Sequence, residues 1–447
     1  MSDFRSAMGQ PRVTGRLAPL LLFLTIGIAG CGGGHSSLGG GGGNPITIAF
    51  SSDRALDGSN QGDGFTSNIW VIKSDGSGAI PLTKLTAAGV SNSNAVWSPD
   101  GKKLAFVAVR AFDGSNAMQT DSSGQPSFTA NVWVMNADGS GAMPLTRLTA
   151  SSVLLTGNPV WSPDSTRVAY ASNRALDGSD ALNQFGNSNI WVARADGSGA
   201  QPLTTLNVQS GGTMRSPAWS PDGGKIIFAS DLALSGSGIA NPADNIWVIN
   251  ADGSGLQPLT RLTNVSVSAP LWSPDGAKIA FESIRALDGS DARSPGPTLN
   301  IWTMRADGSS PVPLTKLTNP SVAGHNPAWS PDSSKIAFIS NSALDGSGAS
   351  NGTENTWVMN ADGSSPQPLT RLTVTLQSQN FVSLSPPSWS PDGRVAFNSR
   401  AAFDGSNAPN AGFIFNIWVV NSNGSGLGPV TKLTGGATDC FFPQWQP

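Results

Sequence analysis

The chain is poor in the residue types on which most catalytic and metal sites depend. Its 447 residues include two cysteines, two histidines and one tyrosine, and only 12% of the residues are charged. Two cysteines are too few for a disulfide framework, so stability has to come from packing. A formal net charge of −3 provides no basic field that would attract nucleic acid.

Tryptophan is abundant instead, and its positions show a repeat. The chain has 14 Trp, and they occur as two Trp in each of seven similar units. The first kind of Trp opens a Trp-Ser-Pro-Asp motif in six units, at Trp97, Trp161, Trp219, Trp272, Trp329 and Trp389, and Trp445 is its seventh member, without the motif. The other follows an Asn by two places, at Trp70, Trp133, Trp191, Trp247, Trp302, Trp357 and Trp418. Self-similarity of this kind predicts a repeat architecture.

Each unit reads as four short strands, here named A to D in chain order. Strand A ends at the first Trp, as in residues 158–161, and Ser-Pro-Asp-Gly then forms a tight turn. Strand B follows, as in residues 103–108, and strand C is an apolar run such as residues 245–250, which indicates burial on both faces. Strand D is predicted in Pro-Leu-Thr-Arg-Leu-Thr, as in residues 144–149; its Pro and its charge mark it as an outer edge.

Four-stranded units in tandem predict an all-β fold, a seven-bladed β-propeller of antiparallel blades covering residues 45–447. The first unit begins at residues 46–52 with strand B and lacks strand A, whereas residues 441–445 form a strand A with nothing after it. We therefore expect the C-terminal strand A to pair with the N-terminal strands B–D and close the ring. The Trp residues then pack between blades; the alternative is a ladder of rings that stack on a ligand.

The N-terminal residues predict export and a membrane anchor. Arg5, Arg12 and Arg16 precede the apolar stretch 17–28, which is too short to span a bilayer comfortably. Ile-Ala-Gly-Cys, ending at Cys31, resembles a bacterial lipobox, which implies a signal peptide over 1–30 and lipidation of Cys31. The alternative is an ordinary secretory signal with an incidental cysteine. Residues 31–44 form a Gly-rich tether.

The repeat motifs resemble those of a known family. Trp-Ser-Pro-Asp-Gly, Ile-Trp-Val-Met-Asn-Ala-Asp-Gly-Ser-Gly and Pro-Leu-Thr-Arg-Leu-Thr are similar to the TolB-type, WD-like β-propeller repeats of bacterial envelope proteins. The resemblance covers nearly all of residues 44–447. It implies a protein of the periplasm, the outer membrane or the cell surface. The family's namesake has six blades and an extra N-terminal α/β domain, whereas this chain has seven units after the tether.

The connections between strands differ in how constant they are. The A–B and C–D turns keep nearly fixed lengths, whereas the B–C connection from Phe106 to Asn131 is much longer than that from Phe338 to Asn355. In an up-and-down sheet the B–C and D–A loops share one face. Binding sites gather on variable loops held by a rigid frame, so we expect function on the B–C/D–A face.

Two residue sets on that face are candidate sites. The first is an Asp-Gly turn in the B–C loops, whose hard oxygens suit calcium, although an Asp that caps its own backbone is the alternative. Its members are Asp57, Asp113, Asp177, Asp288, Asp345 and Asp404. The second set precedes strand A at the mouth of the central channel, where converging polar groups suit a small ligand or remain solvated. Its members are Asn94, Asn158, Ser216, His325, Asn326 and Asp439.

No catalytic constellation is evident in the sequence. Cys440 has no histidine nearby in the chain, and the glutamates of the folded domain, Glu282 and Glu354, have no obvious partners. We therefore expect a monomeric, lipid-anchored, non-enzymatic propeller that binds an envelope protein or a glycan, with no cofactor unless calcium binds. The alternatives are a hydrolase or lyase with an Asp-based site at the channel mouth, and a mainly structural envelope protein.

Overall fold

The protein is described by a computed structural model. It describes residues 45–57, 66–121, 123–150, 153–155, 157–207, 212–234, 240–294, 298–373, 385–404, 410, 412, 414–434 and 439–447. The predicted signal peptide, tether and lipidation site at Cys31 lie outside these residues. Within them, no helix is long and apolar enough to cross a lipid bilayer.

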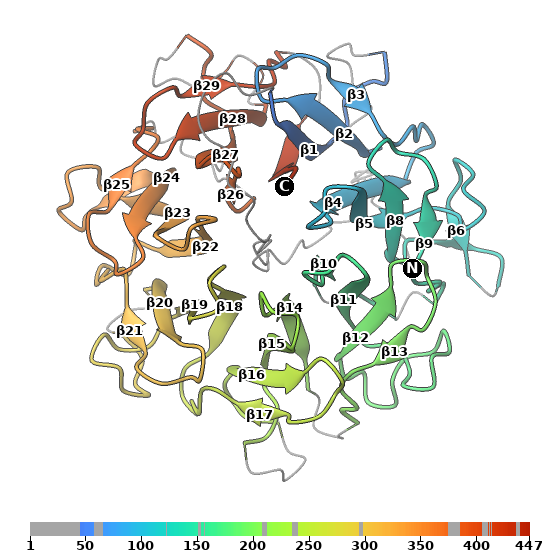
Figure 1. The fold of residues 1–447 in the computed structure, drawn as a ribbon, viewed down its shortest axis with the longest axis horizontal. Helices are drawn as coiled ribbons and strands as arrows, with labels where there is room; N and C mark the ends of the chain where they lie inside the picture. Colours follow the sequence, from blue (N-terminus) through green and yellow to red (C-terminus); the bar gives the residue numbers. More distant parts are fainter. Residues whose placement is uncertain are drawn as a thin grey trace, which may run out of the picture.

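Seven four-stranded antiparallel sheets are arranged in a ring, which confirms the predicted propeller (Figure 1). Strands A lie nearest the centre: β30 (Cys440–Trp445), β4 (Ser91–Trp97), β10 (Val160–Trp161), β14 (Met214–Trp219), β18 (Val267–Trp272), β22 (Gly324–Trp329) and β26 (Ser388–Trp389). Strands B are β1 (Thr47–Ser52), β5 (Lys103–Val109), β11 (Arg167–Ser172), β15 (Lys225–Ser230), β19 (Lys278–Ser283), β23 (Lys335–Ser342) and β27 (Arg394–Ser399).

The two outer positions complete each blade. Strands C are β2 (Asn68–Lys73), β8 (Asn131–Asn136), β12 (Asn189–Arg194), β16 (Asn245–Asn250), β20 (Asn300–Arg305), β24 (Ser350–Asn360) and β28 (Asn416–Asn421). Strands D are β3 (Ile80–Pro81), β9 (Met143–Pro144), β13 (Gln201–Pro202), β17 (Gln257–Pro258), β21 (Val312–Pro313), β25 (Gln367–Pro368) and β29 (Gly428–Pro429). We number the blades one to seven, beginning with the blade that contains β1.

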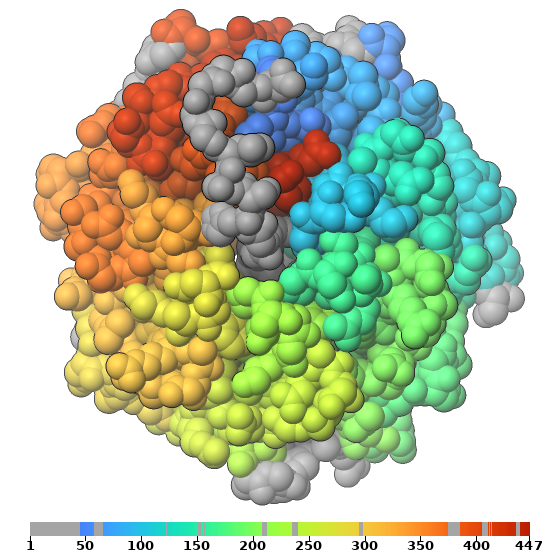
Figure 2. All heavy atoms as spheres, in the orientation of Figure 1, coloured from blue at the N-terminus to red at the C-terminus, as the bar shows by residue number. Residues whose placement is uncertain are grey.

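Blade one joins the two ends of the chain, as predicted. Its sheet has the order β3-β2-β1-β30, and Ile48 lies opposite Trp445 while Ser52 lies opposite Cys440. The C-terminal residues lie against the N-terminal blade beside the centre of the ring (Figure 2). Trp445 Nε1 also donates to the Ser388 carbonyl of blade seven at 3.0 Å, so the closing strand is tied to both neighbouring blades.

The core lies between the blades. Each of seven apolar clusters contains residues from two neighbouring blades. The strand C residues Trp70, Trp133, Trp191 and Trp302 are fully buried in these clusters. The structure thus places the Trp residues in core packing rather than in an exposed ladder. By area counting, one buried indole stabilises the ring by up to roughly 5 kcal/mol.

The predicted extent of strand D was wrong. In blade two the paired residues are Met143–Pro144, whereas residues 145–149 form no strand. An Asn side chain replaces the ladder: Asn131 Nδ2 donates to the Leu148 carbonyl at 2.9 Å, and Asn131 Oδ1 accepts from Leu148 N and Thr146 Oγ1. The same side-chain clamp recurs in all seven blades, on Asn68, Asn131, Asn189, Asn245, Asn300, Asn355 and Asn416.

Candidate binding site on the inner rim of the variable-loop face

The innermost strands carry a bulge at one repeated position, three residues before their Trp. Asn94, Ser216, Ala269, Asn326 and Phe442 all have φ between 47° and 53°. The ladder register shifts at this point, for example between His325 and Ala328. A bulge of this kind re-aims the neighbouring side chains, and residues with strained φ cluster at functional sites. We call the ring formed by this position and the residues around it the inner rim of the B–C/D–A face.

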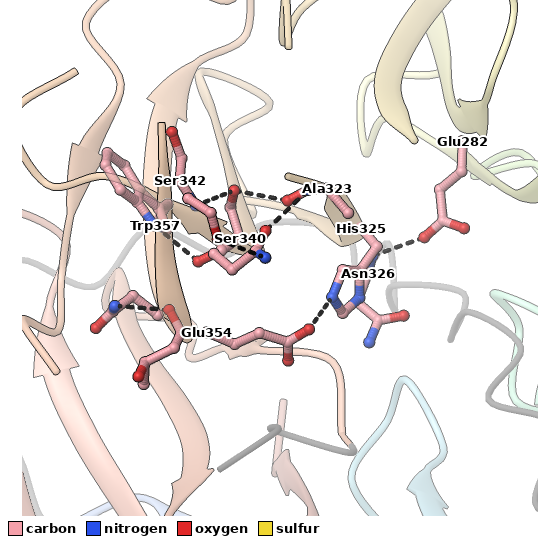
Figure 3. A network of polar contacts seen from close by, with 12 residues as sticks. Glu282, Ala323, His325, Asn326, Ser340, Ser342, Glu354 and Trp357 are labelled. Carbon is pink, nitrogen blue, oxygen red and sulfur yellow. Dashed lines mark hydrogen bonds and ion pairs between the residues drawn. The ribbon is translucent and has the colours of Figure 1, made fainter. Parts of the chain in front are cut away.

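Blades five and six bring the two glutamates and the histidine together on the inner rim (Figure 3). His325 Nε2 lies 2.9 Å from Glu354 Oε1, an ion pair between β22 and β24 of blade six. Glu282, from β19 of blade five, accepts from the backbone N–H of Asn326 at 2.6 Å and from Ser268 Oγ at 3.0 Å. The bulge at Asn326 turns that N–H away from its own sheet, so it reaches the neighbouring blade.

The charge state of His325 follows from these neighbours. Burial lowers the pKa of the imidazole, but the hydrogen bond to Glu354 and the charges of Glu354 and Glu282 outweigh it, so the pKa is raised overall. Glu354 keeps one carboxylate oxygen, Oε2, buried without a hydrogen bond, and the Asn326 side chain makes none within the described residues. The site therefore retains hydrogen-bonding capacity that the described part of the chain does not use.

The other predicted rim residues form separate contacts on other blades. Asn94 Nδ2 donates to Asn158 Oδ1 at 2.7 Å across blades two and three. Ser216 Oγ in blade four is buried, with no hydrogen-bond partner among the residues that the structure describes. Asp439 accepts from Phe415 N at 2.7 Å, and burial raises the pKa of its carboxyl despite that hydrogen bond and the Arg400 charge. The six residues thus line one rim but do not form one cluster.

The Asp-Gly turns lie on separate blades, and the observed Asp side chains cap their own loops. Asp113 Oδ1, for example, accepts from Ser115 N at 2.8 Å, and the same contact occurs at Asp177, Asp288 and Asp345. Among the described residues, no group of three or more His, Cys, Asp or Glu is placed to hold a metal ion. The calcium hypothesis, which includes Asp57 and Asp404, remains a prediction.

The arginines that stand three residues before Asp57, Asp113, Asp177 and Asp288 have a role that the sequence reasoning missed. The Arg110 guanidinium lies 4.8 Å from the ring centre of Trp133 and donates to the Gly114 carbonyl at 2.5 Å. Arg54, Arg174 and Arg285 stack on the strand C Trp of their own blades in the same way. This cation–π contact holds the first residues of the B–C loop against the core. The variable loops therefore begin at a fixed position in each of these blades.

The sequence reasoning also missed the pairing of Glu282 and Glu354 with His325 and Asn326. Glu354 is far from His325 in the chain, and Glu282 belongs to another blade. The one available signal was position: His325 and Glu354 replace residues of other types at equivalent places in the repeat. In blade four the same two places hold Arg215 and Asp244, which form an ion pair.

The blades form a seven-bladed β-propeller, and comparisons with known proteins show that the chain is similar to propellers of the TolB type. Residues 128–290 match the family described as the TolB beta propeller domain. A curated relative, the Tol-Pal system protein TolB of Anaeromyxobacter dehalogenans, is 31% identical over 116 residues, which are 26% of this chain and 21% of the relative.

Two further matches are to proteins named as peptidases. The uncharacterized peptidase YuxL of Bacillus subtilis is 26% identical over 214 residues, which are 43% of this chain and 30% of the relative. A solved Mycobacterium tuberculosis puromycin-hydrolyzing peptidase aligns with a TM-score of 0.56 at 14% identity, over 87% of this chain and 52% of that one. This structural likeness shows the fold alone, and the chain spans less than a third of either curated relative.

Proposed function

We propose that the protein is a non-enzymatic binding module that engages an envelope protein through its B–C/D–A face. The observation that carries the proposal is the inner rim. There, equivalent positions of a uniform frame hold different charged pairs: His325 with Glu354 in blade six, and Arg215 with Asp244 in blade four. A structural ring needs no such variety, whereas recognition of a specific partner does.

A protein partner is favoured over a glycan. One relative is named as a Tol-Pal system protein, which supports a protein as the partner. We further propose that Cys31 carries a lipid that holds the propeller at a membrane of the envelope through the tether 31–44. The residue after Cys31 is Gly32 rather than an aspartate of the kind that retains lipoproteins at the inner membrane, which favours the outer membrane.

Site-specific photo-crosslinking in intact cells tests the choice of face. A photoreactive amino acid at Ala349 or Ser290, in B–C loops of blades six and five, is expected to capture one envelope protein. The same probe at the exposed Ser77 or Ser140, in C–D turns on the opposite face, is the matched control. Adducts from the C–D turns alone, or from neither face, would show that the proposed binding function of this face is wrong.

A second candidate is a hydrolase or lyase at the inner rim, favoured by the His325–Glu354 pair. A carboxylate that holds one imidazole nitrogen leaves the other for proton transfer, and His325 Nδ1 makes no hydrogen bond within the described residues. The sequence-based version of this candidate relied on an Asp at the channel mouth. Asp439 instead bonds the backbone of blade seven, so the histidine is the better candidate base.

Substrate screening separates the binding module from the enzyme. Purified protein is incubated with peptide and glycan libraries, in parallel with the His325→Gln and Asp439→Asn variants. Turnover that His325→Gln abolishes and Asp439→Asn leaves unchanged supports the histidine-based enzyme, and the reverse pattern supports the Asp-based one. The binding module predicts no turnover with any of the three proteins.

A further inference from the structure

Exposed apolar side chains are unevenly distributed over the propeller. Within the described residues, four of the large exposed ones, Ile80, Leu256, Val312 and Leu427, lie in or next to the outermost strands D. The other four belong to loops of blades two and three on the B–C/D–A face. They are Phe128, Leu154, Leu182 and Phe185, with 61%, 52%, 41% and 38% of their surfaces exposed, and we call them the blade 2–3 patch.

Hydrogen bonds connect the loops that carry the blade 2–3 patch. Thr129, next to Phe128, donates to the Ala150 carbonyl at 3.1 Å. Ala150 N in turn donates to Asp180 Oδ2 at 3.2 Å, two residues before Leu182. Asn173, which follows strand B of blade three, donates its N–H to the Leu154 carbonyl. This bond connects the D–A loop that holds Leu154 to blade three. The four apolar side chains therefore stand on connected backbone rather than on independent loop tips.

Blade two contributes an additional element to these connected loops. Its B–C loop, the longest of the predicted connections, contains a small hairpin of β6 (Gln119–Thr120) and β7 (Pro126–Ser127), and Phe128 follows it directly. A Cβ added at Gly89 would lie 2.9 Å from Met118 Sδ and 3.6 Å from the Phe128 ring. Met118 thus adds a flexible apolar side chain at the edge of the patch, of a type common at adaptable binding surfaces.

The loops that carry the patch are negatively charged. The two B–C loops that build it, 111–129 and 175–188, contain four aspartates and no lysine or arginine: Asp113, Asp121, Asp177 and Asp180. Hydrogen bonds from Ser115, Ser123 and Ser179 lower the pKa of the first three, so these carboxylates are ionised at neutral pH.

The cations next to these loops are already engaged with aromatic rings. Arg110 and Arg174 lie over Trp133 and Trp191. Arg147 lies 5.5 Å from the ring centre of Phe112. The loops of the patch therefore present apolar side chains together with carboxylates, and a complementary surface has to be apolar and basic.

We infer that the blade 2–3 patch is the docking surface for a partner-protein segment in which apolar side chains alternate with lysine or arginine. This inference rests on the proposed binding function and narrows it to one sector of the face and one partner chemistry. The apolar side chains of the segment would cover Phe128, Leu154, Leu182 and Phe185. Its cations would lie over the aspartates, which would accelerate association at low salt.

Fluorescence anisotropy with synthetic peptides tests the inference on the full chain. Three labelled peptides of equal length alternate Lys with Phe, Lys with Ser, or Glu with Phe. The Lys/Phe peptide is expected to bind at least about tenfold more tightly than the other two, and to weaken as salt is added. The triple variant Phe128→Ser/Leu182→Ser/Phe185→Ser is expected to lose that preference. The variant Ile80→Ser/Val312→Ser/Leu427→Ser, on the outer rim, is the matched control and is expected to keep it.

Several results would overturn the inference. Equal affinity for the Lys/Ser peptide would remove the apolar contribution, and equal affinity for the Glu/Phe peptide would remove the charge contribution. Self-association that the patch variant abolishes would identify a second copy as the occupant. Binding of the purified protein to anionic phospholipid vesicles through the patch would identify a membrane.

The crosslinking experiment distinguishes failure of this inference from failure of the proposed function. If the patch variant still yields the adduct from Ala349, the face binds a partner but the patch does not dock it. If no adduct forms in the unmodified protein either, the binding function itself is wrong.

Discussion

His325 Nε2 and Glu354 Oε1 lie 2.9 Å apart on the inner rim, in the blade next to that of Glu282. Most other polar groups of the rim contact backbone or neutral side chains, whereas this imidazole lies between two carboxylates. The arrangement raises the pKa of His325 although the ring is largely buried. Its protonation is thereby coupled to folding.

The stability that the pair contributes should depend on pH. The folded-state pKa of His325 lies above its ordinary value of 6.5. The pair therefore contributes stability that is fully present below pH 6.5 and is lost as the pH rises through the folded pKa. We expect Glu354→Gln to lower the free energy of unfolding most at mildly acidic pH and progressively less in alkaline solution, as measured by urea unfolding.

The matching control uses the His325→Gln background, in which Glu354→Gln should have an effect that changes little between acidic and neutral pH. The imidazole can also be titrated directly by NMR, because the chain has only two histidines. A His325 titration at or below the ordinary value would contradict the structure.

The Asn clamp predicts large and local effects within a single strand. Asn131→Ala removes four side-chain hydrogen bonds. It leaves Leu148 N, the carbonyls of Leu148 and Thr129, and Thr146 Oγ1 without this partner in a buried place. We expect a loss of roughly 2–4 kcal/mol in unfolding free energy. Asn136, at the exposed end of the same strand, is the control, and its replacement by Ala should cost at most about 0.5 kcal/mol. Equal losses at the two positions would rule out the clamp.

Calcium removal should leave the protein unchanged. The observed aspartates of the Asp-Gly turns direct an oxygen to their own backbone, and they stand on different blades. We therefore expect the same melting curve in EGTA as in millimolar-range calcium, recorded by circular dichroism. A reproducible fall in melting temperature on chelation would instead support a metal site in these loops.

The blades could be predicted from the sequence because their signals are local and repeated. Two Trp at fixed places in each unit, a Pro-Asp-Gly turn and a C-terminal half-unit define the strands and the closure. The extent of strand D could not be predicted, because the Asn131 side chain makes the hydrogen bonds that backbone groups make in a strand ladder. The distance in sequence between Asn131 and Leu148 matches no pattern that marks the end of a strand.

The candidate binding site was only partly predictable, because its contacts also depend on geometry that no sequence pattern marks. His325 and Asn326 were identified as residues before strand A, whereas they lie within it, in β22. Their contacts with Glu354 and Glu282 depend on a bulge. That bulge occurs at Asn, Ser, Ala and Phe, so no glycine marks it in the sequence. The blade 2–3 patch was hidden as well, since Phe128 and Leu154 read as ordinary apolar residues until their exposure is known.

The central claim is that the closing strand holds the ring that positions the variable-loop face, and a truncation series tests it most directly. Thermal unfolding is compared for the intact chain, a chain without Pro447 and a chain without residues 440–447. The short truncation should melt as the intact chain does. The long one removes Trp445 and the pairing with β1, so it should melt at a sharply lower temperature and lose cooperativity. An unchanged melting curve for the long truncation would contradict the account.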